Sequence, residues 1–270
     1  MLLRNAKIIF NKPVSAELYH MGLLCPDIAA KIQPGQFLMV RIQDRLDPLL
    51  RRPFAVHRLY PNDPPGSFEM LYKVVGRGTQ LLANMQRGDF LNLLGPLGRG
   101  FRLPQDKGFV LMVAGGIGIA PLPYLAETLA ASGNKGPFVL WFGGKTSTDL
   151  VCVQHFNDLG FAVQLVTEDG SEGKKGLVTG HLEQWLTQQD ELPKVMYSCG
   201  PYLMQRSVAE MAARLGIPSQ LSMEALMGCG VGACLSCSLR CHPPKGVQDP
   251  HYANVCQDGP VFDGEEIFWD

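Results

Sequence analysis

Four cysteines close to the C-terminus have the residue type and spacing of iron–sulfur ligands. Cys229, Cys234 and Cys237 follow the pattern C-x4-C-x2-C, and Cys256 comes after a further 18 residues. Thiolates are soft ligands, and this pattern with one distant cysteine is the plant-type spacing for a [2Fe–2S] cluster. Glycines inside the first gap let a loop wrap tightly and direct its N–H groups at the sulfurs. We therefore predict that these four cysteines bind a [2Fe–2S] cluster.

Other metal sites fit the same segment less well. Structural zinc sites usually take their ligands from two matched cysteine pairs, whereas the first three cysteines here crowd into nine residues with one x2 pair. A Rieske centre needs two histidine ligands on one iron, and the positions of His242 and His251 do not suit that role. Cys241 is an alternative fourth ligand, but plant-type loops take their last thiolate from a separate segment, which favours Cys256.

A glycine-rich turn in the middle of the chain has the chemistry of a pyrophosphate site. Gly115, Gly116, Gly118 and Pro121 lie in the segment GGIGIAP, which follows an apolar strand and opens a helix. Glycines allow the backbone to approach a phosphate closely, and the helix start offers unpaired N–H groups. Pro121 replaces the last glycine of the usual fingerprint, and proline is tolerated in a first helical turn. An ordinary turn is the alternative, but the strand–turn–helix setting favours dinucleotide binding.

Two later strands end in residues that could complete the dinucleotide site. Glu168 and Asp169 follow one strand, and Cys199, Gly200 and Pro201 connect another strand to a helix. Ligands of open parallel sheets lie at the carboxyl ends of the strands, where an acid can bond ribose hydroxyls and favours NAD over NADP. The alternatives are a solvated turn for the two acids and a small buried residue for the cysteine.

A third set of residues, in the first hundred, could bind a flavin. Arg52, Pro53, Phe54 and Ala55 combine a phosphate-binding guanidinium with an aromatic ring that could lie against a planar group. Further on, a strand runs into a glycine turn that offers backbone N–H groups and a hydroxyl to a phosphate. The candidate residues of this second segment are Leu71, Tyr72, Lys73, Gly78 and Thr79. A structural Arg-Pro turn on a barrel is the alternative.

The elements that must position these residues fall into three regions. Residues 1–103 contain six short apolar or alternating runs and one helical run, TQLLANM, which predicts a small antiparallel β-barrel. Residues 104–221 alternate strands with helices, which predicts a doubly wound parallel sheet. One of these helices is expected at DLVCVQHF, preceded by capping-box spacing from Thr146 to Asp149. Residues 222–270 form a cysteine-rich and then acidic segment.

Composition and charge exclude several classes of protein. The chain has 270 residues, 46% of them hydrophobic, and a net charge of −1, which argues against a generally basic nucleic-acid binder. The uncharged span 108–126 is long enough for a membrane helix, but its glycines and prolines favour a strand, a turn and a helix start. We read no secretory signal and expect a cytoplasmic protein whose clustered thiols do metal or redox chemistry. Cys25 and Cys152 lie in apolar runs and are expected in cores.

Together, these motifs resemble those of the ferredoxin–NADP reductase superfamily. More narrowly, essentially all 270 residues are similar to the electron transfer subunits of NAD-dependent dihydroorotate dehydrogenases of type B. Arg52–Ala55 is similar to the family's flavin motif Arg-x-Tyr-Ser, Leu71–Lys73 and Gly78–Thr79 look like further FAD contacts, and residues 227–237 and 256–264 look like its iron–sulfur end. Ala55 departs from the family because it lacks the usual serine hydroxyl beside the flavin. The gap between Cys237 and Cys256 is also longer than in the family.

The resemblance implies an electron path with three cofactors. A nicotinamide gives up two electrons as a hydride and an iron–sulfur cluster accepts one at a time, so a flavin that exchanges either number must lie between them. It further implies that Cys199 faces the nicotinamide. The implied partner is a catalytic subunit that carries FMN and oxidises dihydroorotate to orotate in pyrimidine biosynthesis, in a heterotetramer of two copies of each chain.

Two other functions compete with this one. Similar small subunits occur in NADH-dependent ferredoxin:NADP oxidoreductases and in sulfide dehydrogenases, where the chain would deliver electrons to a larger flavoprotein. An interaction module that binds zinc and has no enzymatic activity is the alternative from a different class. Neither nucleic acid nor a membrane is an expected partner.

Overall fold

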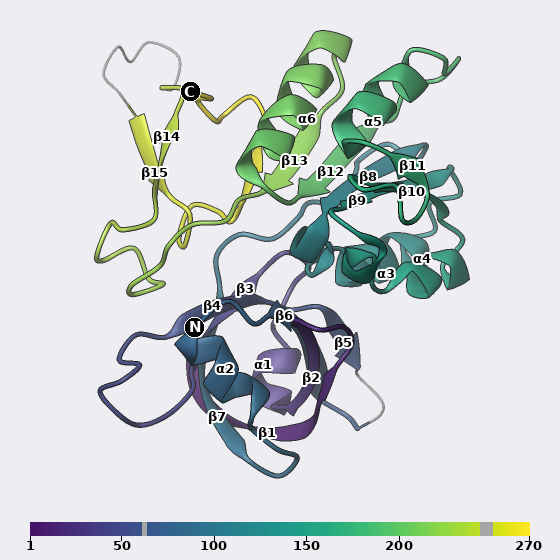
Figure 1. Ribbon diagram of the computed structural model, residues 1–270. Helices are drawn as coiled ribbons and strands as arrows, with labels where there is room; N and C mark the ends of the chain where they lie inside the picture. Colours follow the sequence, from purple (N-terminus) through teal and green to yellow (C-terminus); the bar gives the residue numbers. More distant parts are fainter. Residues whose placement is uncertain (61–63, 244–250) are drawn as a thin grey trace.

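The computed structural model describes residues 1–60, 64–243 and 251–270, which form two large sheets and a small hairpin (Figure 1). The predicted turn at residues 61–66 lies partly outside the described residues. The first sheet has seven antiparallel strands in the order β4-β3-β7-β1-β2-β6-β5, and Figure 1 looks down the barrel into which it curls. Its strands are β1 (Leu2–Pro13), β2 (Leu18–Leu24), β3 (Phe37–Arg41), β4 (Arg52–Ala55), β5 (Arg58–Tyr60), β6 (Ser67–Lys73) and β7 (Phe90–Leu97). The predicted antiparallel barrel is confirmed.

The six predicted runs become seven strands because one of them changes partner. The Val56 N–H donates to the Gln36 carbonyl, beside β3, whereas the next N–H, of His57, donates to the Glu69 carbonyl on β6. The chain therefore leaves one strand and joins another between two adjacent residues. Helix α2 (Arg77–Ala83) confirms the predicted helix, and a short helix α1 (Pro26–Ala29) was not predicted.

The second sheet positions the candidate dinucleotide residues. Its order is β11-β10-β9-β8-β12-β13-β16, with β8 (Val110–Gly115) at the point where the strand order reverses. Ligands of such sheets bind where the order reverses, outside the carboxyl ends of the strands. The other strands are β9 (Phe138–Gly144), β10 (Ala162–Thr167), β11 (Lys174–Lys175), β12 (Val195–Cys199), β13 (Ser219–Ser222) and β16 (Val261–Asp263).

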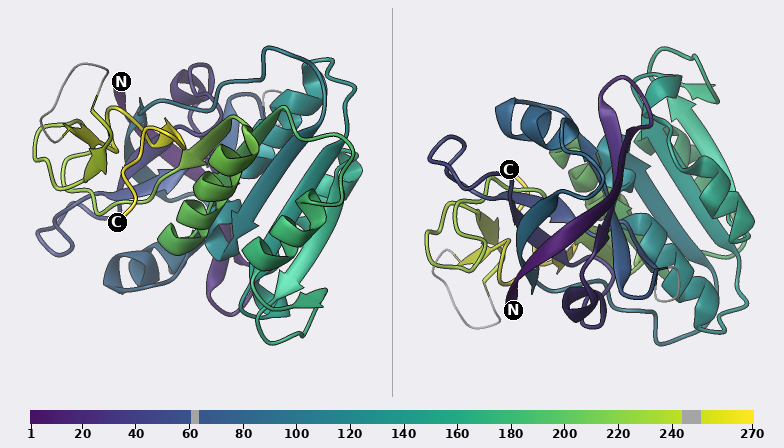
Figure 2. Two further views of the ribbon diagram at one scale, coloured as in Figure 1. Left: turned by 90° about the horizontal axis from the view of Figure 1, so that it is seen from above. Right: turned by 90° about the horizontal axis from the view of Figure 1, so that it is seen from below.

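Helices cover both faces of this sheet, as predicted for a doubly wound fold. Alternate residues of β8 face opposite sides, because Leu111 and Val113 belong to one apolar cluster whereas Val110 and Met112 belong to the other. The first cluster lies under α5 (Val178–Leu186) and α6 (Tyr202–Leu215), and the second under α3 (Leu122–Ala131) and α4 (Val153–Asp158) (Figure 2). The span 108–126 is thus a strand, a 3-10 turn and the start of α3, as predicted. Within the described residues, no helix has the length and apolarity needed to cross a membrane.

The helix predicted at DLVCVQHF starts later than expected. The predicted capping box is present, with the Asp149 carboxylate accepting from the Thr146 N–H, but it caps the 3-10 turn Ser147–Asp149. Cys152 then adopts a left-handed conformation with φ 65°, which an α-helix cannot include. Helix α4 therefore begins only at Val153.

The C-terminal segment is joined to the second sheet. Strands β14 (Ser238–Cys241) and β15 (His251–Asn254) form a hairpin beside α6, and β16 pairs antiparallel with β13 at the edge of the second sheet (Figures 1 and 2). The sheet predicted as parallel therefore has an antiparallel edge strand that the sequence did not indicate. The final residues return to the hairpin, where Ile267 forms a bridge with Cys241 and is fully buried.

Replacing Ile267 by alanine is expected to lower the free energy of unfolding by about 2–5 kcal/mol, the range for a large-to-small change in a core. The midpoint of urea unfolding, followed by tryptophan fluorescence, measures this change. Glu265→Ala, two residues away and exposed, is the control and should change stability by less than about 0.5 kcal/mol. Equal midpoints for the two variants would show that the tail does not hold the hairpin.

Candidate functional site

The predicted flavin residues line one cavity of about 380 Å³ between the barrel and the second sheet. Strand β4, the end of β6, the start of α2 and the turn before α3 form its walls. Of the predicted residues, Arg52, Pro53, Phe54, Ala55, Leu71, Tyr72, Lys73 and Thr79 line it. Pro121, predicted for the dinucleotide, also lines this cavity. Gly78 does not line the cavity but packs against a residue that does, since a Cβ on Gly78 would lie 3.2 Å from Arg52 Nε.

Hydrogen bonds within the protein fix two side chains that line this cavity, those of Tyr72 and Thr79. The Tyr72 hydroxyl donates to Asn11 Oδ1 at 2.9 Å, its ring meets Phe54 edge-on at 5.7 Å, and its burial raises the pKa of the phenol. Thr79 Oγ1 accepts from the N–H groups of Val75 and Gly76 and donates to the Gly76 carbonyl. A hydroxyl has one proton and two lone pairs, so this one is fully engaged. The hydroxyl predicted to meet a phosphate instead organises the turn.

The second cavity, of about 560 Å³, lies at the carboxyl ends of β8, β9 and β10 and at the start of α6. Of the predicted dinucleotide residues, Gly115, Gly116, Glu168 and Pro201 line it, and Lys73, predicted for the flavin, lines it as well. Further lining residues that the sequence analysis did not select include Lys145, Asp149, Thr179, Leu203, Met204 and Ser207. The cavity is thus placed where a nucleotide would meet the glycine turn.

Three predicted dinucleotide residues, Gly118, Asp169 and Gly200, line neither cavity. Asp169 Oδ1 accepts from the N–H and the hydroxyl of Ser171, which lowers the pKa of the Asp169 carboxyl. Gly118 and Gly200 are packed against each other: a Cβ on Gly118 would lie 2.3 Å from the Cys199 carbonyl oxygen and 2.6 Å from the Gly200 Cα. Gly118 thus lets the turn rest directly on the end of β12.

Glu224 lies where the two cavities meet, and Cys199 lies near it at the first cavity. Cys199 lines the first cavity and is buried, and its pKa is raised by burial and by the nearby Glu224 carboxylate. Glu224 lines both cavities, and burial raises the pKa of its carboxyl. The sequence analysis missed Glu224, although it follows the end of β13 just as Glu168 follows β10. The same reasoning about carboxyl ends of strands could have found it.

Residues 229–237, the cysteine loop, direct backbone N–H groups at two of the candidate ligand sulfurs. The N–H groups of Val231, Ala233 and Cys234 donate to Cys229 Sγ at 3.3–3.4 Å, and the Gly232 N–H donates to Cys256 Sγ at 3.1 Å. Hydrogen bonds to cluster sulfurs raise the reduction potential of such sites. Gly230 has a φ of 76°, and a Cβ there would meet the Met39 side chain on β3. Glycine therefore lets the loop rest on the barrel.

The four predicted ligands differ in exposure. Cys237 and Cys256 are buried, whereas Cys234 is exposed, and Ser236 hydrogen bonds lower its pKa to about 6. Burial and the neighbouring Cys237 raise the pKa of Cys256 to about 12. Cys241 lies in β14 with its thiol 3.7 Å from the Leu239 carbonyl oxygen of the same strand. The described contacts thus bring Cys256 to the loop and turn Cys241 toward its own hairpin.

Of the two cysteines predicted in cores, Cys25 is in one and Cys152 lies at the edge of another. Cys25 is buried in the apolar core of the barrel. Cys152 is half-buried and packs against the apolar cluster under α3 and α4.

Comparison with known proteins gives matches over the second and third regions and over the whole chain. Residues 224–268 match the family model described as the iron–sulfur cluster binding domain of dihydroorotate dehydrogenase B, and residues 112–210 match the oxidoreductase NAD-binding domain. Curated relatives named dihydroorotate dehydrogenase B (NAD(+)), electron transfer subunit, include one from Desulforamulus reducens, 36% identical over 98% of both chains. Another, from Geobacillus kaustophilus, is 41% identical over 87% of this chain and 86% of its own length.

Solved structures agree with this fold. A chain from a structure of an NADH-dependent reduced ferredoxin-NADP oxidoreductase has a TM-score of 0.84 and 28% identity, and covers 98% of this chain and 90% of that one. A ferredoxin NADP+ reductase from Neisseria gonorrhoeae, at 19% identity and a TM-score of 0.65 over 79% of this chain and 92% of that one, shares the fold alone. From the full-length identity to its relatives, the chain belongs to the family of electron transfer subunits of dihydroorotate dehydrogenase B.

Proposed function

We propose that this chain carries electrons between NAD(H) and a catalytic partner through FAD and a [2Fe–2S] cluster. The observation that carries the proposal is the order of the three candidate sites. Lys73, Ile117 and Glu224 line both cavities, so the flavin and dinucleotide cavities adjoin. Met227 also lines the first cavity and stands two residues before Cys229. The flavin cavity therefore lies between the dinucleotide cavity and the cysteine loop, as the sequence of electron carriers requires.

The residues present suit these cofactors. The first cavity combines the aromatic rings of Phe54 and Tyr72 with the Arg52 guanidinium, a donor set for a planar ring and a pyrophosphate. The cysteine loop and Cys256 together supply four thiols, and four N–H groups of the loop donate to two of the sulfurs. This arrangement suits a cluster whose sulfurs accept hydrogen bonds. The match to an iron–sulfur family model argues against the zinc-binding interaction module.

The chain's own residues bind and orient the reactants. When bound, these cofactors would supply hydride transfer and the conversion of an electron pair into single electrons. Gly115 and Gly116 bring their backbone to the pyrophosphate, and Glu168 accepts from ribose hydroxyls. Cys199 is buried and Glu224 lines both cavities, and we place them where the nicotinamide would meet the flavin. These residues position the reacting rings, and no separate acid or base is required of the protein.

The partner is a catalytic subunit that holds FMN and converts dihydroorotate to orotate, with two copies of each chain in the complex, in the cytoplasm. The relatives' name, electron transfer subunit, supports such a partner. Within this chain we assign residues 1–103 to FAD, 104–221 to NAD and 222–270 to the cluster. The pairing of β16 with β13 makes the third region depend on the second for its fold.

The proposal is tested by purifying the chain alone and then with the catalytic subunit. Bound FAD, iron and sulfide in stoichiometric amounts, and bleaching of the visible spectrum by NADH, are expected from the chain alone. The complex should then reduce NAD+ when given dihydroorotate. A colourless chain, or a chain whose spectrum NADH does not change, would contradict the proposal.

A second candidate function keeps the same cofactors and changes the partner. The TM-score of 0.84 to a chain of an NADH-dependent ferredoxin-NADP oxidoreductase structure favours it. Identity of 28% to that chain, against 36–41% to the dihydroorotate dehydrogenase relatives, places it second. This second function would be identified if the chain delivered electrons to a larger flavoprotein and delivered none to a dihydroorotate dehydrogenase catalytic subunit.

Replacing Glu168 by glutamine is expected to raise the KM for NADH about tenfold, since a hydrogen bond to a charged group contributes about 1.5–3 kcal/mol and this carboxylate is exposed. The preference for NADH over NADPH should fall as well, because the negative charge near the ribose is removed. Steady-state kinetics with both nucleotides measure both effects.

Asp169→Asn is the matched control. It removes the same charge at the next residue, whose carboxylate accepts hydrogen bonds from Ser171 and does not line the dinucleotide cavity. It should leave the KM for NADH within about twofold. Equal effects of the two variants would remove Glu168 from the binding site.

A further inference from the structure

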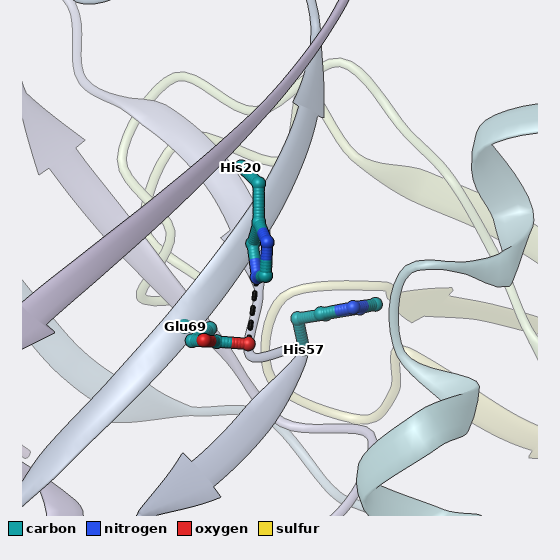
Figure 3. A group of neighbouring side chains, drawn as sticks. All are labelled: His20, His57 and Glu69. Carbon is teal, nitrogen blue, oxygen red and sulfur yellow. Dashed lines mark hydrogen bonds and ion pairs between the residues drawn. The ribbon is translucent and has the colours of Figure 1, made fainter. Parts of the chain in front are cut away.

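A buried polar cluster lies between the barrel and the helix that follows the glycine turn. It contains His20 on β2, Glu69 on β6 and His57 between β4 and β5 (Figure 3). His20 Nε2 is 2.6 Å from Glu69 Oε2. Burial raises the pKa of Glu69, but His20, His57 and Tyr60 together outweigh burial, and the net shift of this pKa is downward. His57 is 1% exposed and takes no part in the electron path described above.

Both ring nitrogens of His57 have a partner. Nδ1 lies 2.8 Å from the carbonyl oxygen of Ala120, and Nε2 lies 3.6 Å from Cys152 Sγ. A carbonyl oxygen only accepts, so Nδ1 carries the proton and Nε2 accepts from the Cys152 thiol. Burial lowers the pKa of His57 to about 4 and raises that of Cys152 to about 11, so both are neutral at pH 7.

The cluster is a hydrogen-bond network rather than a metal site. Ligand atoms of His20, His57 and Glu69 lie within 4.8 Å of one another, which is near enough to suggest a metal ion. Figure 3 shows, however, that the imidazole of His57 extends away from the paired His20 and Glu69. Its two nitrogens are directed at Ala120 and Cys152, so it is placed to hold the turn and not an ion.

The backbone at Cys152 supports a specific role for this contact. Cys152 has a φ of 65°, in the left-handed region that costs a non-glycine residue about 1–2 kcal/mol. Such strain persists where the surrounding structure fixes the residue, and it concentrates at functional sites. Here the strained residue places its thiol against the ring of His57.

The carbonyl that His57 holds belongs to the turn shared by both cavities. Ala120 and Ile117 line the flavin cavity, and Gly115, Gly116 and Ile117 line the dinucleotide cavity. On the opposite side, the turn rests on Cys199 through Gly118. The turn is therefore held between the barrel and the end of β12, and His57 follows the flavin strand β4 by only two residues.

We propose that His57 is a positioning residue, whose Nδ1–H bond to Ala120 sets the glycine turn, and with it the nicotinamide, at the distance from the flavin that hydride transfer needs. The inference rests on the proposed function. A displacement of about 1 Å from a reacting geometry can slow a reaction by about 10²-fold. Loss of this bond is therefore expected to slow flavin reduction at saturating NADH while leaving FAD content unchanged.

A second bond across the same interface provides the control. The Tyr124 hydroxyl, on α3, donates to the Ile32 carbonyl of the barrel at 3.1 Å. Tyr124→Phe removes one hydrogen bond between the barrel and α3, whereas a His57 variant removes the bond between the barrel and the turn before α3. Tyr124 does not belong to the turn, so its loss reports the effect of weakened docking alone.

The experiment compares flavin reduction by NADH in stopped flow for four holoproteins: wild type, His57→Leu, His57→Asn and Tyr124→Phe. His57→Leu should reduce flavin at least about tenfold more slowly. His57→Asn should recover most of the rate, because its Nδ2–H can occupy the position of Nδ1–H. Tyr124→Phe should keep the wild-type rate. A wild-type rate in His57→Leu, or equal slowing in the Leu and Asn variants, would overturn the proposal.

Two further measurements keep the test independent of folding and of the proposed function. If His57→Leu does not fold, His57→Gln replaces it. The amide N–H of glutamine lies one bond farther from the backbone than that of asparagine, so His57→Gln should slow flavin reduction although His57→Asn does not. Hydrogen exchange of residues 115–121 should be faster in His57→Leu or His57→Gln than in wild type or Tyr124→Phe, and unchanged exchange overturns the positioning role. A wild-type protein without NADH-dependent bleaching would instead contradict the proposed function.

Discussion

Cys256→Ala is expected to yield protein with less than about a tenth of the iron and acid-labile sulfide of the wild type, whereas Cys241→Ala should retain both. A cluster with three thiolates lacks a ligand that binding requires, because plant-type [2Fe–2S] sites use four. The Gly232 N–H donates to Cys256 Sγ, so this thiol belongs to the cysteine loop. The Cys241 thiol is directed at the Leu239 carbonyl oxygen, and the backbone of Cys241 forms a bridge with Ile267 of the tail.

The two cysteines make a matched pair, since both are buried and both lie in the third region. Iron and sulfide analysis and the electron paramagnetic resonance of the reduced protein measure cluster content directly. In Cys256→Ala, NADH should still bleach the FAD absorbance, because the flavin cavity has its own walls in the barrel and the second sheet. Electron delivery to the partner should be lost. Cluster loss in Cys241→Ala with retention in Cys256→Ala would reverse the ligand assignment.

Local patterns in the sequence predicted much of the fold. Strand β7 alternates buried residues, such as Leu91 and Leu93, with partly exposed or exposed ones, which is the period-2 pattern of a half-buried strand. Val110 to Ala114 are all buried, as expected for a central parallel strand covered on both faces. The cysteine spacing and the glycine turn were equally visible, because their chemistry depends on residues close together in the chain.

The remaining features depend on contacts between distant segments. The break at Val56 and His57 follows from a change of hydrogen-bond partner, from Gln36 to Glu69, that no local pattern encodes. Pairing of β16 with β13 likewise joins the C-terminal segment to a strand 40 residues away. The Thr79 hydroxyl was predicted to serve a phosphate, but the geometry of its own turn engages it first.

Gly118→Ala is expected to slow NADH-dependent flavin reduction by about 100-fold. The added Cβ would lie 2.3 Å from the Cys199 carbonyl oxygen and 2.6 Å from the Gly200 Cα, and both are backbone atoms that cannot rotate away. Either the glycine turn or the end of β12 must move, and a shift of about 1 Å in a reacting geometry can cost about 10²-fold in rate. The overpacking itself should destabilise the protein by about 1–3 kcal/mol.

Gly180→Ala is the control, because among the described residues a Cβ at this exposed position in α5 meets nothing within 4 Å. It should keep the wild-type rate and gain up to about 1 kcal/mol of stability, since alanine favours the helix over glycine. Single-turnover reduction of the holoproteins, with FAD and iron content measured on the same samples, separates slow hydride transfer from cofactor loss. Because Gly118 lies outside the dinucleotide cavity, a normal rate in Gly118→Ala would mean that the turn and β12 tolerate separation, and contact between them would then not set the nicotinamide position.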